Sequence, residues 1–391
     1  MNVLEVYASY YKMGGVQVHI RDLCECLSRR GHSVSVLTYS ERKKSSDHKV
    51  PIEIESYKIP KILLLLRYPA ILILCFKLYT FSLNRKIDII HVHGYTAAIA
   101  GSLVKKLLNK PVVATFHLLP KYTERSTPLL DIIEKRISSA LLAQIDAIIN
   151  VSKWNLLEMK KSGIKNSTNL LIRNWVPHSV TNVPSEQDSV YNERDSKKVS
   201  SNQELQIILI GRLSKQKGFD IFIKAANILS KKKLKFKAKI IGTGIERNNL
   251  LKLCEKLGLK NSIDFLGFIS DSKKKSILNS SDIFVLPSRF EGLPLTILEA
   301  MYFEKPVIAT DINGIKEVIT NEVDGLIVNC TAKDIAQKLE LLLTNDYFRN
   351  EIAKNARKKV EQKFSFKNCE DTILKLEMIN ENYQPFINNV L

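Results

Sequence analysis

The 391-residue sequence lacks several features that define whole classes of protein. Its six cysteines form no Cys-x-x-Cys pair and are too sparse for a disulfide scaffold or a zinc site, which indicates a reducing compartment. The longest apolar run, 62–76, is broken by Arg67 and Pro69, so it falls short of the roughly 20 residues that cross a bilayer. A strand pattern begins at once, so we expect no signal peptide. The expected class is a globular protein of the cytoplasm.

Acidic residues are also scarce: 59 lysines and arginines stand against 40 aspartates and glutamates, a net charge of +19. This excess implies acidic partners such as phosphorylated substrates, an anionic membrane surface or nucleic acid. The basic residues are scattered, and no aromatic-interleaved stripe or recognition motif accompanies them, so we expect no specific nucleic-acid partner. The run 62–76 would either pack on its own sheet or lie on the inner face of the cell membrane.

What the sequence does contain is an alternation of apolar strands and helical patterns, present once in each half. This alternation predicts parallel, doubly wound sheets, and two such units in tandem would face each other across a cleft. We predict an α/β protein with Rossmann-like domains at 1–180 and 205–366, a polar linker at 181–204 and a C-terminal helix at 367–391. The predicted strands are 3–9, 33–39, 87–94, 111–117, 146–152, 205–211, 236–242, 263–268, 281–288 and 306–310. A helical pattern runs from 334 to about 366.

The most informative stretch is FEGLPLTILEAMYFEKPVIAT, residues 290–310. It places Glu291 and Glu299 around a short turn between a predicted strand and an apolar helix, where parallel sheets bind their ligands. Pro294 suits the first helical turn, so the N–H groups of Leu295 and Thr296 would face outward and attract phosphate.

Glu299 would lie about one helical turn further on, within reach of hydroxyl groups. Phosphate beside vicinal hydroxyls describes a nucleotide or a nucleotide-sugar. The alternative is that Glu291 only caps the helix and that Glu299 is a solvated surface acid.

Two further loops follow predicted strands in the second half. GRLSKQKGFD, residues 211–220, carries Arg212 and Lys217 beside a glycine turn, which suits a diphosphate; surface charge is the alternative. IIGTGIE, residues 240–246, carries Gly242, whose turn could equally serve packing alone.

In the first half, Gly15 follows the first strand and would let the backbone approach a phosphate closely, unless the turn is simply a tight one. His117 ends a predicted strand and could be either a ligand-binding or a satisfied core residue. His91 and His93 alternate on one strand and therefore face the same side of the sheet. No His, Asp or Glu group has metal-ligand spacing.

Taken together, EGLPLTILEAM with PVIATDINGIKEVI, the GRL…KG loop and MGGVQVHIRDLCECLSRRGHSVSVLTY resemble the retaining glycosyltransferases of family four, which have the GT-B fold. The resemblance covers nearly the whole chain. Its amino-terminal part is nearest to enzymes that act on phosphatidylinositol-type lipids. The sequence departs from the family's usual pattern at Asn174-Trp175-Val176-Pro177 and Asn313-Gly314, so the resemblance does not extend to a particular acceptor or sugar.

The resemblance also implies roles for individual residues. Those implied for the donor are pyrophosphate binding by Arg212 and Lys217, ribose binding by Glu299 and proximity to the base for Gly242. Those implied for the transferred sugar and the acceptor are contacts from Glu291, His117, Gln17 and His19, although His19 could equally lie on the helix surface.

We therefore expect a hexosyltransferase that uses a nucleoside-diphosphate sugar, a hydroxyl acceptor and no cofactor. No Asp-x-Asp occurs, so we expect no metal requirement. A lipid-linked acceptor and an anionic membrane surface are hypotheses that follow from the charge and the apolar run. The alternatives are a UDP-sugar 2-epimerase of the same fold, a basic protein that binds nucleic acid or anionic surfaces, and a non-catalytic relative.

Overall fold

The computed structural model describes residues 1–7, 14–39, 52–57, 67–118, 137, 139–162, 164, 168–181 and 204–388. Their contacts divide the chain into two compact units. Unit 1 comprises residues 1–174 and 367–391, and unit 2 comprises residues 175–366. The first boundary thus falls at 174, before the predicted 180, and the C-terminal helix belongs to the same unit as the first strands. The predicted linker, 181–204, lies almost entirely outside the described residues.

Unit 1 is built on a seven-stranded parallel sheet in the order β3-β2-β1-β4-β5-β6-β7. Its central strands are buried on both faces, which explains their mainly apolar sequences. The strands are β1 (Asn2–Tyr7), β2 (Ser33–Tyr39), β3 (Glu53–Tyr57), β4 (Ile89–His93), β5 (Val112–Phe116), β6 (Ala147–Asn150) and β7 (Asn169–Leu171).

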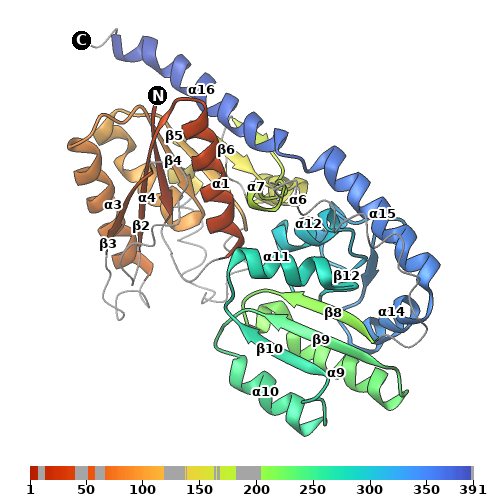
Figure 1. Ribbon diagram of the computed structural model, residues 1–391. Helices are drawn as coiled ribbons and strands as arrows, with labels where there is room; N and C mark the ends of the chain where they lie inside the picture. The colour runs from red at the N-terminus through yellow and green to blue at the C-terminus, as the bar shows by residue number, and fades with distance from the viewer. Residues whose placement is uncertain are drawn as a thin grey trace. The chain divides into compact units, whose positions relative to one another are not determined.

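Helices pack beside that sheet in two groups (Figure 1). Helices α3 and α4 lie against each other and contribute to the main apolar core of the unit, while α1 packs against the long α16. At the α1–α16 contact, His32 Nε2 lies 2.7 Å from Glu377 Oε1. The helices are α1 (Gly15–Arg29), α3 (Arg67–Leu83), α4 (Tyr95–Leu108), α6 (Lys153–Lys161) and α16 (Lys367–Asn388).

Unit 2 repeats the architecture with a six-stranded parallel sheet in the order β10-β9-β8-β11-β12-β13. Helices α9 and α14 pack together, as do α12 and α15. The strands are β8 (Leu205–Ile210), β9 (Phe236–Ile241), β10 (Ile263–Gly267), β11 (Ile283–Leu286), β12 (Val307–Thr310) and β13 (Leu326–Val328). The helices are α7 (His178–Thr181), η3 (Lys215–Lys217), α9 (Phe219–Lys231), α10 (Arg247–Lys256), α11 (Asp271–Ser280), α12 (Leu295–Tyr302), α13 (Asn313–Lys316), α14 (Ala332–Thr344) and α15 (Asp346–Lys363).

The structure corrects the sequence prediction in three places. The single helical pattern over 334–366 is two helices, because Asn345 ends α14 and its side chain accepts from Phe348 N–H at 3.0 Å to cap α15. Pro294 immediately precedes α12 instead of lying in its first turn. The edge strands β3, β7 and β13 were not predicted, because β7 and β13 have only three residues each and β3 carries two glutamates and a serine among its five.

Candidate active site

In unit 2 the two charged loops of the sequence follow neighbouring strands. β8 pairs with β11, while β9 and β10 lie on the other side of β8. The strand order therefore reverses between β8 and β11, although all strands are parallel. In open α/β sheets, ligands bind at such a switch point, outside the carboxyl ends of the strands. The loop after β8 carries Arg212 and Lys217, and the loop after β11 carries Glu291.

The loops are joined by an ion pair. Lys217 Nζ lies 2.5 Å from Glu291 Oε1, which also accepts from Ser288 Oγ at 2.8 Å. The side chains of Lys217 and Glu291 are only 17% and 9% exposed, so water screens this pair less than a surface pair. A second ion pair supports the first, because Arg289 contacts both carboxylate oxygens of Asp220 at 3.0 and 2.9 Å. Ser288, Arg289 and Asp220 were not predicted as site residues.

Glu299 is the fifth residue of the eight-residue helix α12 and is 2% exposed, which excludes the solvated surface acid. Its Oε1 accepts from Lys274 Nζ at 2.9 Å, whereas its buried Oε2 has no hydrogen-bond partner among the described residues. Thr296 Oγ1 is likewise buried without a partner there. Within the described chain, the N–H groups of Leu295 and Thr296 donate to no backbone carbonyl. The start of α12 therefore combines open donors with an open, buried acceptor.

Arg212 and Gly242 complete the predicted donor set. Arg212 is exposed and forms no ion pair with any residue that the structure describes. Gly242 has φ +144°, and a Cβ there would lie 1.8 Å from the carbonyl oxygen of Gly211. The close approach of the two loops therefore requires glycine at position 242. Packing alone explains this residue, without a role in binding.

In unit 1 the polar groups lie inside the strands. Glu5 on β1 is fully buried, and β1 pairs with β4, which carries His91 and His93. His93 Nε2 lies 2.6 Å from Glu5 Oε2, and His91 Nδ1 lies 3.0 Å from the same oxygen. His91 Nε2 lies 2.8 Å from Thr115 Oγ1 on β5. The two histidines do share one side of the sheet, as predicted, where they bind one carboxylate.

His117 follows β5 and extends this network, because its Nε2 lies 3.3 Å from His93 Nδ1. His19 on α1 meets His117 edge-on with ring centroids 4.7 Å apart, and it is 3% exposed, so it is not a helix-surface residue. His19, His93 and His117 each offer an atom within 4.8 Å of the others, so they could hold a metal ion. Sequence spacing could not show this group, since its members come from three separate elements.

Burial and mutual proximity set the protonation of this cluster. Burial alone would raise the pKa of Glu5, but His91 and His93 bind its charged form and lower that pKa to about 2. Burial, followed by the charge of His91, lowers the pKa of His93 to about 4. Burial and the neighbouring rings also hold the pKa values of His19 and His117 below their usual range. At neutral pH, Glu5 is therefore ionised, while the imidazoles of His19, His93 and His117 are neutral.

The start of α1 is organised by Gln17, whose Oε1 accepts from Gly14 N–H at 2.7 Å. Gly15 opens the helix and is exposed. Residues 8–13, which connect β1 to this helix, lie outside the described part of the chain. The predicted acceptor residues Gln17 and His19 are both buried on one helix of unit 1.

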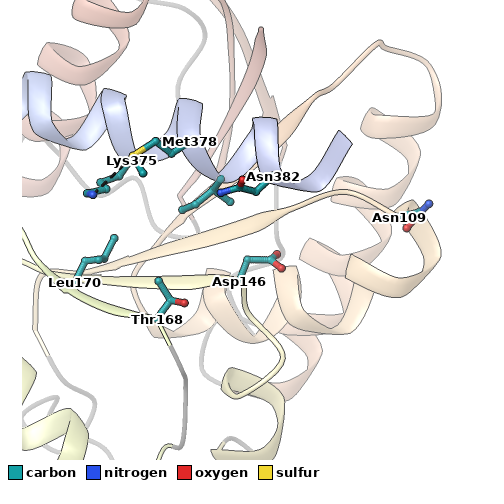
Figure 2. Close-up of a pocket in the computed structure, with 8 residues that line it drawn as sticks. Asn109, Asp146, Thr168, Leu170, Lys375, Met378 and Asn382 are labelled. Carbon is teal, nitrogen blue, oxygen red and sulfur yellow. Dashed lines mark hydrogen bonds between the residues drawn. The ribbon is translucent and has the colours of Figure 1, made fainter. Parts of the chain in front are cut away.

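A groove of about 620 Å³ lies elsewhere on unit 1 (Figure 2). Asp146 and Thr168 immediately precede β6 and β7, and Lys375 and Met378 of α16 also line the groove. It therefore lies at the amino ends of the strands, whereas His93 and His117 lie at the carboxyl ends of theirs. We do not assign it to the active site.

Family models identify the chain. The Glycosyltransferase Family 4 model matches residues 13–180, and the Glycosyl transferases group 1 model matches residues 191–359. The chain belongs to glycosyltransferase family 4. It is an enzyme, and membership of this family displaces the epimerase, nucleic-acid-binding and non-catalytic alternatives.

Similar proteins span nearly the same length. An uncharacterized glycosyltransferase of Methanocaldococcus jannaschii is 29% identical over 91% of this chain and 92% of its own. The UDP-Gal:alpha-D-GlcNAc-diphosphoundecaprenol alpha-1,3-galactosyltransferase of Escherichia coli is 28% identical over 74% of each chain. HepE of Anabaena, solved in complex with UDP-glucose, has a TM-score of 0.73 at 18% identity over 99% of both chains. The structural likeness confirms the predicted GT-B fold.

Proposed function

We propose that this family 4 glycosyltransferase moves a hexose from a nucleoside-diphosphate sugar to a hydroxyl of a lipid-linked glycan, with retention of the anomeric configuration. The observation that carries the proposal is the group at the carboxyl ends of β8 and β11, where Lys217 and Glu291 are paired beside the open start of α12. Similar proteins include one solved with UDP-glucose and one named for a diphosphoundecaprenol acceptor, which supports a donor and an acceptor of these kinds.

The donor diphosphate would lie against the cationic loop after β8. Arg212 is exposed without an ion-pair partner in the described chain, so its guanidinium can take two phosphate oxygens, while Lys217 supplies a point charge. The N–H groups of Leu295 and Thr296 add donors at the start of α12. Glu299 would accept the ribose hydroxyls through Oε2, its carboxylate oxygen without a partner.

The transfer then needs no covalent adduct with the protein. The acceptor oxygen forms a bond to the anomeric carbon as the bond to the diphosphate breaks, and the acceptor proton passes to the departing phosphate oxygen on the same face. Glu291, held by Lys217 and Ser288, would orient the sugar. Arg212, Lys217 and the helix start would stabilise the leaving charge, so we propose that no metal is required.

The decisive experiment is a thermal-shift screen of the full chain against UDP, GDP, ADP and their hexose conjugates in EDTA. A ligand at about a hundred times its dissociation constant stabilises the native state by roughly 2.7 kcal/mol. We expect one nucleotide to stabilise the wild type but not Lys217→Ala. Lys215→Ala is the matched control, because Lys215 lies in the same turn with an exposed side chain. Equal stabilisation of wild type and Lys217→Ala would contradict the donor site.

Exposed apolar side chains on unit 1 support the proposal of a lipid-linked acceptor. Helices α3 and α4 pack side by side, and both expose large apolar side chains: Leu72, Phe76, Leu83, Leu103 and Leu107 are 42–70% exposed. No helix among the described residues is long and apolar enough to span a bilayer. With a net charge of +19, these side chains suit an anionic lipid surface, so we propose peripheral attachment at the inner face of the cell membrane.

Vesicle sedimentation tests this attachment. Phe76→Asp should reduce binding to phosphatidylglycerol-containing vesicles several-fold, because a charge would replace a buried contact with the lipid. Tyr347→Asp in unit 2 is the control, since Tyr347 is also highly exposed, at 77%. Wild-type protein that stays in the supernatant at physiological salt would refute the attachment and leave the donor site untouched.

A further inference from the structure

A chain of hydrogen bonds runs from Glu5 to His117 across three adjacent strands. Glu5 on β1 contacts His93 on β4 at 2.6 Å, and His93 contacts His117, just after β5, at 3.3 Å. Glu5 and His93 are fully buried, and His117, the last residue of this hydrogen-bonded series, is partly exposed. A buried carboxylate in β1 is not explained by packing, because an ionised group in an apolar core is costly unless hydrogen bonds compensate it.

The hydrogen bonds fix which nitrogen of each ring carries its proton. An ionised carboxylate can only accept, and a neutral imidazole has one N–H and one acceptor nitrogen. His93 must therefore donate through Nε2 to Glu5, which leaves its Nδ1 as an acceptor. His117 must then donate through Nε2 to His93, which leaves His117 Nδ1 with a free lone pair. His91 follows the opposite pattern, because its Nδ1 faces Glu5 and its Nε2 faces Thr115 Oγ1.

We propose that Glu5 is a positioning residue, which acts through His93 to fix the tautomer and orientation of His117. His117 then presents an acceptor nitrogen and no N–H to the substrate, so its partner must be a hydroxyl that donates. This assignment rests on the proposed function, in which His117 contacts the transferred sugar or the acceptor.

The assignment predicts a specificity. A site that accepts a hydrogen bond from one hydroxyl selects against a substrate in which that hydroxyl is missing or methylated, because the acceptor is then left unpaired. Substrates with a hydrogen-bond acceptor at that position meet the lone pair of His117 and are also rejected. The recognised group is thus a free sugar hydroxyl.

A metal ion is the competing explanation for the same rings. An ion held by His19, His93 and His117 would use His93 Nδ1 as a ligand, with Glu5 orienting that ring from behind. No proton would then lie between His93 and His117. The two explanations therefore differ in a measurable proton position.

The test is nitrogen-15 NMR of the imidazole rings in the full chain at pH 7.5, after dialysis against EDTA and a metal assay. Each ring is assigned by its own His→Gln variant. We expect protonated Nε2 in His93 and His117 and protonated Nδ1 in His91. The proposal is overturned if His117 of the wild type carries its proton on Nδ1. It is also overturned if the dialysed protein retains one zinc ion per chain. Neither result requires a variant of Glu5.

Two variants then separate positioning from simple structure. Glu5→Gln keeps the volume but removes the charge that both rings face and replaces one carboxylate oxygen with an NH2 that donates, so the tautomer of His117 should become mixed and turnover should fall about ten- to a hundred-fold. Nucleotide affinity, which belongs to unit 2, should stay within about twofold. Thr115→Val removes only the partner of His91 Nε2 and should leave the His117 signal unchanged.

The outcomes distinguish this inference from the proposed function. If no nucleotide stabilises the wild type while the tautomers are as stated, the proposed function fails and the tautomer assignment stands. If nucleotide binds and Glu5→Gln changes neither the His117 tautomer nor turnover, the positioning role fails and the donor site stands.

Discussion

The polar cluster of unit 1 lies mainly inside the strands, whereas the charged residues Lys217 and Glu291 of unit 2 lie in the loops that follow the strands. Glu5, His91 and His93 belong to β1 and β4, the two strands at the switch point of the first sheet. Lys217 and Glu291 follow β8 and β11, the corresponding strands of the second sheet. The same topology thus carries two sites of different construction.

The difference separates two kinds of task. Groups in loops remain partly accessible, as Lys217 does at 17% exposure, so they can respond to a bound ligand. Groups inside strands are closed off from water, so they can only set the state of a neighbour such as His117. We therefore expect unit 2 to respond to ligand and to loop geometry, and unit 1 to respond to pH.

Loop geometry gives the largest expected effect. In Gly242→Ala the new Cβ would lie 1.8 Å from Gly211 O, so the backbone must move and unit 2 should lose about 4 kcal/mol of unfolding free energy. Gly258→Ala is the control, because φ there is +69° and nothing lies within 4 Å, so about 1–2 kcal/mol is expected.

The two tryptophans make this measurable for each unit. Trp154 belongs to unit 1 and Trp175 to unit 2, so a Trp154→Phe background reports the urea unfolding of unit 2 alone. A Gly242→Ala transition that overlays that of Gly258→Ala would show that the two loops do not need this close approach.

The second prediction concerns the ion pair of unit 2. Glu291→Gln keeps the volume and can still accept from Ser288, but it removes the charge that faces Lys217. We expect kcat to fall about a hundred-fold, since an oriented charge at the reacting sugar is lost. Nucleotide affinity should change less than about threefold, because the freed Lys217 still meets the phosphates.

Steady-state kinetics with the nucleotide-sugar that stabilises the wild type would check this. Ser288→Ala serves as the control and should cost less than about tenfold, because the ion pair remains. A rise in KM with kcat unchanged would mean that Glu291 contributes only to binding.

The third prediction is the acid sensitivity of unit 1. The pKa of His93 is about 4 in the folded state against 6.5 for the free side chain, so the unfolded chain alone takes up this proton as pH falls. Glu5 contributes in the same direction, because its lowered pKa gives stability that is present above pH 4.5 and is lost toward pH 2. Unit 1 should therefore lose on the order of 2–3 kcal/mol between pH 7 and 4.

Urea unfolding at pH 7, 5.5 and 4 would measure the loss, with Trp154 as the reporter in a Trp175→Phe background. The reverse background follows unit 2 in the same series. Parallel losses in the two units would assign the acid sensitivity to general charge repulsion.

The same contrast explains what could be predicted from the sequence. Arg212, Lys217 and Glu291 follow predicted strands within six residues, and Glu299 lies on the helix predicted after one of them, so their position relative to a sheet edge could be predicted locally. Lys274 was hidden in a run of lysines, because only the packing of α11 near α12 shows that it meets Glu299.

The cluster of unit 1 could not be predicted in this way. Glu5 and His91 are 86 residues apart, and their contact depends on β1 and β4 being neighbours in the correct register. The strand pattern predicted that His91 and His93 share one side of the sheet, but not the carboxylate that they bind. Metal-ligand spacing is likewise a local pattern in the sequence. It cannot reveal His19, His93 and His117, because these histidines come from separate elements.

The smallest effect is expected at the ribose end of the donor site. Glu299→Gln keeps the shape of a side chain that is 2% exposed but weakens its hydrogen bonds to hydroxyl groups, so the donor KM should rise about tenfold with little change in kcat. Glu304→Gln, at an exposed position just after α12, is the control.

Deoxy-nucleotides make this prediction specific to the ribose. The wild type should bind the stabilising nucleotide more tightly than its 2′-deoxy form, because Glu299 Oε2 is a buried acceptor that a ribose hydroxyl would satisfy. In Glu299→Gln that preference should shrink toward unity. If wild type and variant prefer the ribonucleotide by the same factor, Glu299 does not bind the ribose, and its pairing with Lys274 is structural.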